Sequence, residues 1–190
     1  LWMKDEDGTY IACNSRFEDF FGAKEKDILG KNDYDFLPAE DVEFFREHDK
    51  NAMRADKPVS NFEEITFACD GHKEYLHTTK TKILDSSGKI FGVLGVGRDI
   101  SELKKADDFL KKTNEILEMI ATGEEAHKVY DEIALMYESR HKGMRCSLLE
   151  LKEGKLMHGG APSMPQEYCE AVNGLEYGPE VGSCGSSTFT

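Results

Sequence analysis

The sequence lacks the features of several protein classes. No apolar run approaches the roughly 20 residues of a membrane-spanning helix, and no signal peptide is visible. The five cysteines are widely spaced and odd in number, and no Cys-x-x-Cys pair occurs, which argues against a disulfide framework or a zinc knuckle. We therefore expect a cytoplasmic location in a reducing compartment, with no direct membrane contact by this segment.

Familiar catalytic motifs are also missing. There is no Gly-x-Ser-x-Gly, His-Glu-x-x-His or P-loop, and the six histidines are scattered without ligand spacing. No Gly-Gly-Asp-Glu-Phe run and no kinase ATP-binding pattern are present. "GVLGVG" (92–97) departs from Gly-x-Gly-x-x-Gly and lies in a predicted strand, so its glycines indicate close packing against a ligand or a helix. We expect neither a catalytic site nor a metal site.

Basic residues are in the minority. The formal net charge is −13, from 37 acidic and 24 basic residues, and the basic residues form no stripe. Such a surface repels phosphate backbones, so nucleic acid is not an expected partner. A hydrophobic content of 39% with eleven phenylalanines predicts a globular chain. Because the chain begins at Leu1 rather than Met, we expect it to be a piece of a longer protein.

The first hundred residues predict an α+β domain. Residues 1–14 form a hairpin with a turn at Asp5-Glu6-Asp7-Gly8, and Asn14 caps a helix that stops at Gly22. A short helix follows in 23–30 and a longer amphipathic helix before Pro58. Period-two patterns then predict three antiparallel strands in 59–68, 73–84 and 89–100.

A charged helix follows these strands directly. Leu103, Leu110 and Leu117 are seven residues apart, which is typical of a coiled-coil seam. A second helix is predicted from about Glu124 to Tyr137, and then a strand pair that turns at Glu153-Gly154. The remaining residues are expected to form a short helix and glycine-rich loops. The pattern stops at Thr190 with two strands and no closing element.

Several stretches carry a family resemblance. "LWMKDEDGTYIACNSRFEDFFG", "GKNDYDFLP", "YLHTTKTKILDSSGKIFGVLGVG" and "RDIS" make residues 1–102 resemble a PAS domain, which implies a five-stranded antiparallel sheet with short helices on one face. "GMRCSLLELKEGKLMHGGAPSMPQEY" and "GLEYGPEVGSCGSSTFT" make residues 112–190 resemble the N-terminal part of a GAF domain, whose later strands are missing. With the connector helix at 103–122, the chain resembles the input region of bacterial sensor histidine kinases and diguanylate cyclases.

The resemblance implies a pocket between the sheet and the helices. One interpretation is that this pocket holds a small organic ligand. The other is that side chains fill the space and no ligand binds. The candidate lining residues are Phe20, Phe36, Phe45, Met53, Thr78 and Val96. Haem is disfavoured because His48 lies about one turn later than an axial ligand of such domains. Flavin is disfavoured because "GKNDYDFL" holds no cysteine.

The junction "RDIS" implies signal relay. In PAS sensors the last strand passes into a signalling helix through such a motif, here Arg98, Asp99, Ile100 and Ser101. Asp99 is expected to act as the N-cap of that helix, with Glu102 completing a capping box. The leucine seam then predicts a parallel homodimer. The whole is interpreted as the sensory region of a two-component or cyclic-dinucleotide signalling protein.

Two alternatives remain open. Cys184 in "GSCG" resembles the cysteine of GAF-fold enzymes that reduce free methionine sulfoxide, so a redox-active GAF protein is one of them. A ligand-free PAS dimerisation scaffold is the other. The signal itself cannot be read from the residues.

Overall fold

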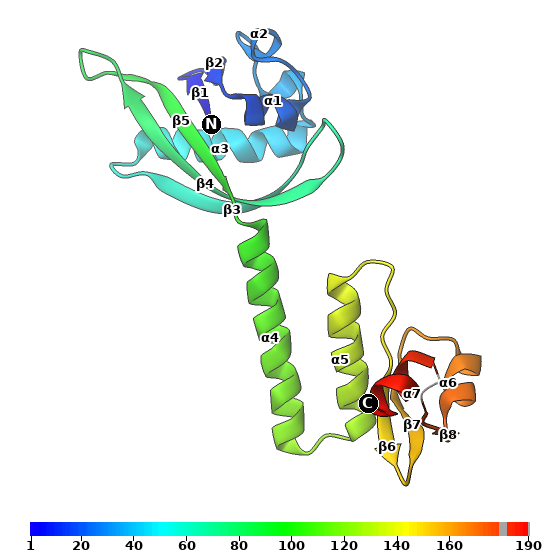
Figure 1. The fold of residues 1–190 in the computed structure, drawn as a ribbon. Helices are drawn as coiled ribbons and strands as arrows, with labels where there is room; N and C mark the ends of the chain where they lie inside the picture. Colours follow the sequence, from blue (N-terminus) through cyan, green and yellow to red (C-terminus); the bar gives the residue numbers. More distant parts are fainter. Residues whose placement is uncertain (179–181, 190) are drawn as a thin grey trace. The chain divides into compact units, whose positions relative to one another are not determined.

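The computed structural model describes residues 1–178 and 182–189. Two compact units divide the chain, one from Leu1 to Lys105 and one from Ala106 to Thr190 (Figure 1). Helix α4 (Ser101–Thr122) begins in the first unit and continues into the second. None of the described helices is both long and apolar enough to cross a membrane.

The first unit is built on a five-stranded antiparallel sheet. The strand order is β2-β1-β5-β4-β3, and every neighbouring pair is antiparallel. The strands are β1 (Trp2–Asp5), β2 (Tyr10–Cys13), β3 (Val59–Thr66), β4 (Lys73–Leu84) and β5 (Ile90–Asp99). The predicted α+β fold, with its hairpin and three later strands, is therefore confirmed for this unit.

Short helices cover one face of this sheet (Figure 1). They are α1 (Ser15–Phe21), α2 (Glu25–Ile28), the 3₁₀ helix η1 (Asp33–Asp35) and α3 (Ala39–Arg54). The predicted cap of α1 is present, because the Asn14 side chain accepts the amide of Phe17 at 3.2 Å and Gly22 ends the helix with φ of 65°. Aromatic rings pack around Phe17 of α1. The centroid of its ring lies 5.1 Å from that of Trp2 and 4.8 Å from that of Phe21.

The glycines of "GVLGVG" serve close packing, as expected. A methyl group on Gly95 would overlap the indole of Trp2, and one on Gly92 would overlap the carbonyl of Lys4 on the neighbouring strand. These two glycines let β1 and its tryptophan lie directly against β5. The contact partner is thus a strand and its side chain rather than a ligand or a helix.

The second unit combines helices with a three-stranded sheet of order β6-β7-β8. Its elements after α4 are α5 (Ala126–Arg140), β6 (Leu148–Lys152), β7 (Lys155–Gly160), α6 (Gln166–Val172), β8 (Leu175–Glu176) and α7 (Gly182–Phe189). The predicted hairpin turn is present, and both of its central residues have positive φ, 51° at Glu153 and 77° at Gly154. Positive φ at both central residues is typical of the two-residue hairpin turn whose backbone twist matches that of the flanking strands.

Two expectations for the end of the chain are corrected. A third strand, β8, pairs with β7, where the sequence predicts only a strand pair. Residues 182–189 form helix α7, where glycine-rich loops are expected. Glycine lowers helix propensity by only about 1 kcal/mol per residue, so tertiary contacts can outweigh it.

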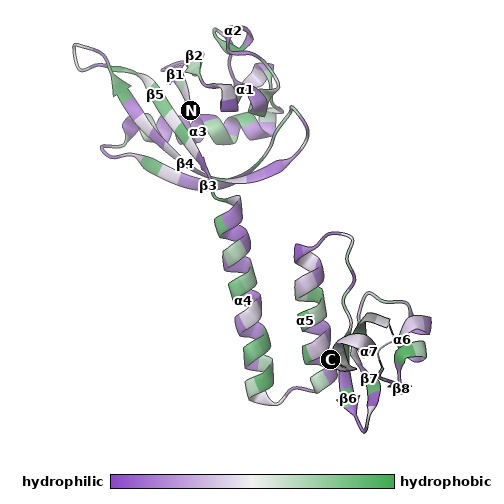
Figure 2. Ribbon diagram, viewed as in Figure 1, coloured by the Kyte–Doolittle hydropathy of each residue, from purple (hydrophilic) through white to green (hydrophobic). Residues whose placement is uncertain are grey.

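Within the second unit, α4 packs against α5 through part of its surface. Ile116 is buried, and the Arg140 guanidinium lies 4.4 Å from the ring centroid of Phe109. The hydroxyl of Thr113 donates to the Met136 sulfur at 3.7 Å. Figure 2 shows polar and apolar residues alternating along α4, which is the pattern of an amphipathic helix.

Candidate ligand-binding site and signal junction

A network of charged side chains lies inside the first unit. The Lys4 ammonium is 2.6 Å from an Asp33 oxygen and 2.9 Å from an Asp49 oxygen. The Lys80 ammonium binds the other Asp49 oxygen at 2.6 Å, and the Tyr10 hydroxyl donates to Asp33 at 2.5 Å. All five side chains are buried. Each comes from a different element, namely β1, β2, η1, α3 and β4.

The local structure explains how each charge reaches the interior. Lys4 lies two residues after the buried Trp2, so strand alternation puts both on the same face. Lys80 follows the buried Thr78 in the same way. Asp49 lies on α3 seven residues after the buried Val42, which is two helical turns. The interior faces of β1, η1, α3 and β4 therefore each carry one charge of the network.

The electrostatics of the network are balanced. Burial raises the pKa of Tyr10 well above its ordinary value, and the Asp33 carboxylate adds to that increase. Burial opposes the charged form of Asp49, but the ammonium groups of Lys4 and Lys80 outweigh burial and lower its pKa. Two cations therefore neutralise two anions, and the tyrosine stays a hydrogen-bond donor at neutral pH.

Stability alone does not account for such a network. Replacing a buried ion pair by apolar groups of similar volume is often neutral or stabilising, because the desolvation of the charges offsets their attraction. A cluster of this kind next to a cavity is therefore a candidate for ligand recognition.

A cavity of about 120 Å³ adjoins the network. Lys4, Tyr10, Asp33 and Lys80 form part of its wall. Its other polar lining residues are Arg16, Glu63, Glu74 and Asp99. Its apolar lining comes from Leu1, Trp2, Phe17, Phe20, Leu37, Phe45, Ile65, Phe67, Leu76 and Gly97. An engineered cavity of about 150 Å³ holds one benzene, so this cavity suits a molecule of about one ring.

The structure brings only some of the predicted lining residues to this cavity. Phe20 and Phe45 line it. Phe36 instead stacks on Phe21, with 4.4 Å between ring centroids. Thr78 is fully buried on the same face of β4 as Lys80 and donates to the Glu63 carboxylate, but it is not among the residues that line the cavity.

Two further positions differ from the prediction for reasons of geometry. Val96 is 43% exposed, because the neighbouring Gly97 faces the cavity and alternate residues of a strand point to opposite faces. Met53 is half-buried near the end of α3, away from the lining. His48, considered above for haem, is also outside the lining and its Nδ1 lies 2.8 Å from the carbonyl oxygen of Phe44.

A second polar cluster lies where α1 meets the β3–β4 turn. The Glu74 carboxylate binds the Arg16 guanidinium and accepts a hydrogen bond from His72 Nε2 at 3.0 Å. The Arg16 guanidinium lies 4.4 Å from the ring centroid of Phe67, and the His72 ring stacks on that same phenylalanine. Hydrogen bonds to Asp70 and Glu74 raise the pKa of His72.

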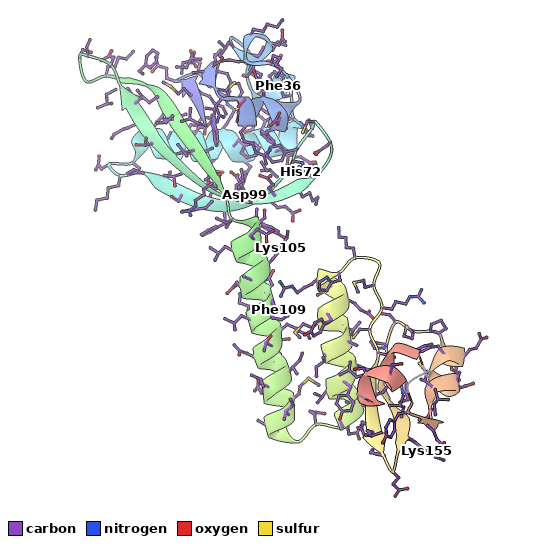
Figure 3. All side chains as sticks on the ribbon, in the orientation of Figure 1. Phe36, His72, Asp99, Lys105, Phe109 and Lys155 are labelled. Atoms are coloured by element: carbon purple, nitrogen blue, oxygen red, sulfur yellow. The ribbon has the colours of Figure 1, made fainter. Side chains whose placement is uncertain are left out.

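The junction between β5 and α4 is tied to the sheet. Ile100 donates its amide to the Tyr75 carbonyl at 2.8 Å, and the Tyr75 amide donates to the Ser101 hydroxyl at 3.0 Å. The Asp99 carboxylate accepts the Ser101 amide at 2.8 Å. Hydrogen bonds from Ser101 lower the pKa of Asp99. Figure 3 shows Asp99 where the strand ends and the helix begins.

The predicted capping box is corrected by this geometry. Helix α4 begins at Ser101, one residue later than the box requires, and the Ile100 carbonyl accepts its first helical bond from Lys104 at 2.8 Å. Glu102 consequently lies in the first turn and pairs with Lys105 at 2.7 Å. Asp99 thus acts from the residue before the cap.

The first turn of α4 and the outer sheet face border a groove of about 360 Å³. His77 stacks on Phe62 there, with 4.8 Å between ring centroids. Phe62 and Leu103 are 74% and 69% exposed. Its lining residues are Phe62, His77, Arg98, Asp99, Ile100, Glu102 and Leu103. Three of the four predicted relay residues therefore border this groove.

The remaining predicted positions lie on α4 and α7. Leu110 and Leu117 are 59% and 57% exposed, while Ile116 beside them is buried. Cys184 is partly buried within α7. Four residues of the buried network escaped the sequence analysis, namely Lys4, Tyr10, Asp33 and Lys80. A charged residue at an inward strand position, such as Lys4, is the signal that could have identified them.

The family model described as PAS fold matches residues 1–105, which is more than half of the chain. The chain belongs to the PAS-fold family. The match ends where the first compact unit ends.

Curated relatives of this PAS chain are sensor proteins. It is 26% identical over 130 residues to the methyl sulfide methyltransferase-associated sensor of Methanosarcina acetivorans, which covers 67% of this chain and 13% of the relative. It is 27% identical over 114 residues to the aerobic respiration control sensor protein ArcB of Escherichia coli, which covers 60% of this chain and 14% of the relative. The chain thus spans about one seventh of each relative.

One solved structure supports the fold at a TM-score of 0.50. A VqmA complex with ligand and DNA from Vibrio cholerae superposes with a TM-score of 0.50 at 20% identity, over 73% of each chain. A PAS domain from Colwellia psychrerythraea gives a TM-score of 0.44 at 20% identity, over 53% of this chain and 85% of that one.

Proposed function

We propose that residues 1–105 bind a small uncharged molecule in the cavity and that the chain is an input region of a sensor histidine kinase. The observation that carries the proposal is the buried Lys4–Asp49–Lys80 network at the cavity wall. The sensor relatives support the signalling role, and one further relative is named a methanogenesis regulatory histidine kinase. A diguanylate cyclase output is the alternative that the sequence raised.

The charges of the wall disfavour an anionic ligand. Lys4 and Lys80 are already neutralised by Asp33 and Asp49, so a ligand anion would find no free counter-charge at these two lysines. Burying an unpaired charge is far more costly than burying a hydrogen-bonded polar group. Aromatic rings around the cavity suit a flat molecule, and the polar wall offers donors and acceptors for its edge.

The cavity also offers a route to α4. Gly97 and Asp99 of β5 line it, and Asp99 holds the Ser101 amide at the start of the helix. A ligand that shifts β5 would change this hydrogen bond and, with it, the first turn of α4. We infer that Arg98, Asp99, Ile100 and Ser101 relay the signal in this way.

Trp2 provides the test of ligand binding. It is the single tryptophan of the chain and lines the cavity, so its fluorescence reports occupancy. We expect uncharged single-ring compounds with a donor and an acceptor to change this fluorescence saturably. Ile65→Phe adds bulk to the wall and should weaken binding by about tenfold or more, as overpacking costs about 1–3 kcal/mol. Val96→Ala on the exposed face is the matched control.

Two results would count against the proposal. One is an Ile65→Phe variant that is folded and binds as tightly as the unchanged chain. The other is a chain that binds no compound of this class and carries none when native mass spectrometry is applied to the purified protein. Either result would favour the scaffold alternative.

The exposed leucines of α4 support a homodimer. Leu103, Leu110 and Leu117 share a heptad spacing and are 69%, 59% and 57% exposed. We propose that they form a parallel seam with a second copy. Leu110→Glu should shift the sedimentation coefficient from dimer to monomer, whereas Glu118→Lys should not. A monomeric unchanged chain at high concentration would refute the seam.

The second unit is proposed to be GAF-like. The order of α5, β6, β7 and α6 is the support for this assignment. A redox role for Cys184 remains the alternative, and labelling by a thiol-reactive probe at neutral pH, compared between Cys184 and Cys146, tests it.

A further inference from the structure

The turn between β3 and β4 collects three different metal-binding side chains. Cys69, Asp70 and His72 lie within four residues of sequence, and one ligand atom from each lies within 4.8 Å of the others. The Cys69 sulfur is 3.6 Å from an Asp70 oxygen, and that oxygen also contacts His72 Nδ1. Zinc bonds of about 2.1 Å place tetrahedral ligand atoms about 3.4 Å apart, so only small movements are needed.

The turn is held in place from both sides. Phe67 accepts the Gly71 amide and donates its own amide to the His72 carbonyl, each at 2.8 Å. The Ala68 amide donates to the Phe20 carbonyl of α1 at 2.9 Å. Gly71 has φ of 76°, a backbone conformation that lets the chain reverse between the cysteine and the histidine. The ligand residues therefore sit on an anchored turn.

The histidine ring is oriented as metal-binding histidines are. Its Nε2 contacts Glu74 at 3.0 Å, and its face stacks on Phe67 with 4.4 Å between ring centroids. A histidine that donates one ring N–H to a carboxylate presents the lone pair of its other nitrogen to a metal. Here the other nitrogen, Nδ1, faces Asp70 and Cys69. Figure 3 labels His72 in the first unit.

We propose that Cys69, Asp70 and His72 form a zinc site on the β3–β4 turn. The thiolate sulfur, imidazole nitrogen and carboxylate oxygen are the donors that Zn²⁺ takes in proteins, and water completes the fourth position. The Cys69 thiol releases its proton to solvent on binding, and so does His72 Nδ1 where it is protonated. The sequence analysis expected no metal site, because the six histidines are scattered along the chain. It did not consider His72 together with the nearby Cys69 and Asp70.

The site adjoins the wall of the ligand cavity. Glu74 orients His72 and also binds Arg16, and both Glu74 and Arg16 line that cavity. Phe67, which stacks on His72, lines it as well. Zinc would thereby hold part of the cavity wall in one arrangement. The proposal itself rests on the turn alone and does not require a cavity ligand.

Cobalt and zinc titrations of the whole chain test the site. We expect one equivalent of Co²⁺ to produce a thiolate-to-cobalt charge-transfer band, and Zn²⁺ to abolish it by displacement. Cys69→Ser should remove the band, and His72→Gln should weaken Zn²⁺ binding by at least about tenfold in competition with a chromophoric chelator. Cys146→Ser and His48→Gln are the matched controls and should bind as the unchanged chain does.

Three results would overturn the proposal. The band could persist in Cys69→Ser, His72→Gln could bind Zn²⁺ as tightly as the unchanged chain, or the controls could lose binding as fully as the ligand variants, which would indicate an adventitious ion only. Cys69 is exposed and the other altered side chains are partly exposed. Trp2 fluorescence should show that the first unit is folded in the variants within it, and circular dichroism should show that Cys146→Ser, in the second unit, is folded. Zn²⁺ should also raise the unfolding midpoint of the unchanged chain but not of Cys69→Ser.

Discussion

The two compact units of this chain bury different kinds of side chain. In the described residues, the first unit encloses large aromatic and aliphatic side chains together with five charged ones. Its buried apolar residues are Trp2, Tyr10, Phe17, Phe21, Ile28, Val42, Ala52, Ile65, Phe67 and Val93. The buried apolar residues of the second unit are fewer and mostly smaller, namely Ile116, Val129, Ala134, Leu156 and Ala161.

This difference has energetic consequences. Buried apolar area contributes about 25 cal/mol per Å², so the first unit is expected to be the more stable of the two. Its buried charges fix the relative positions of the elements that carry them more than they stabilise the fold. Each charge must keep its partner, because an unpaired buried charge has a large desolvation cost. The first unit therefore combines a rigid core with a polar site, whereas the second depends on a few apolar contacts between α5 and β7.

The largest expected effect comes from removing the shared anion of the first unit. Asp49→Ala leaves Lys4 and Lys80 without their common carboxylate, and breaking a buried pair costs about 3–5 kcal/mol. Urea unfolding followed by Trp2 fluorescence measures this unit by itself. Glu47→Ala, at an exposed position of the same helix, should change stability by less than about 0.5 kcal/mol. A loss below about 1 kcal/mol in Asp49→Ala would show that the network is dispensable.

The corresponding change in the second unit is Ile116→Ala. Ile116 is 5% exposed and lies on the part of α4 that packs on α5. Truncating a buried isoleucine costs about 2–5 kcal/mol. Hydrogen exchange of peptides from residues 126–140 should therefore speed up, while Trp2 fluorescence keeps the same unfolding midpoint. Equal destabilisation by Glu118→Ala, at an exposed position outside the proposed seam, would contradict the packing described here.

Adding a methyl group to a closely packed glycine should destabilise either unit by a smaller amount. A methyl group on Gly95 would meet Trp2, and one on Gly160 would meet the backbone amide of Asp131 at 2.8 Å. Overpacking of this kind costs about 1–3 kcal/mol. Gly95→Ala should lower the Trp2 midpoint alone, and Gly160→Ala should affect only exchange in the second unit. An unchanged Trp2 midpoint in Gly95→Ala would show loose packing of Trp2 on β5, and unchanged exchange in Gly160→Ala would show loose packing of α5 on β7.

Acid should reduce the stabilisation that Asp49 contributes to the folded first unit. Its pKa in the folded unit is lowered from the ordinary value of 3.8, so the folded state binds the proton less tightly than the unfolded state. The stabilisation is then fully present above about pH 4 and is lost as the pH falls further. The stability difference between the unchanged chain and Asp49→Asn should accordingly shrink below pH 4. A difference that grew in acid would have the wrong sign.

Local signals in the sequence predicted much of the first unit. Asp7-Gly8 and Asn14 marked a turn and a cap that the structure contains, and the heptad leucines marked α4 as a single long helix. These features depend on residues close together in the chain, since turns and caps are made by neighbours. Helix α7 was missed because its glycines favour loops in isolation.

The cavity was predicted only in part. Phe20 and Phe45 were correctly placed at its wall, but Val96 was assigned to the wrong face of β5. A one-residue shift in a strand moves every side chain to the opposite face, so small errors in register exchange inside and outside. The amphipathic pattern before Pro58 predicted helix α3 without showing which cations would meet Asp49 on it.

In the first unit, the sequence by itself determined the order of strands and helices, the turns that join them and the membership of the PAS-fold family. Only the tertiary structure decided that Lys4, Asp33, Asp49 and Lys80 meet in one buried network, and that Arg16 of α1 binds Glu74 beside the β3–β4 turn. The physical reason is the distance along the sequence between the residues that interact. Local structure follows from hydrogen bonds between neighbours, whereas a buried charge is tolerated only where distant elements bring its partner within about 3 Å.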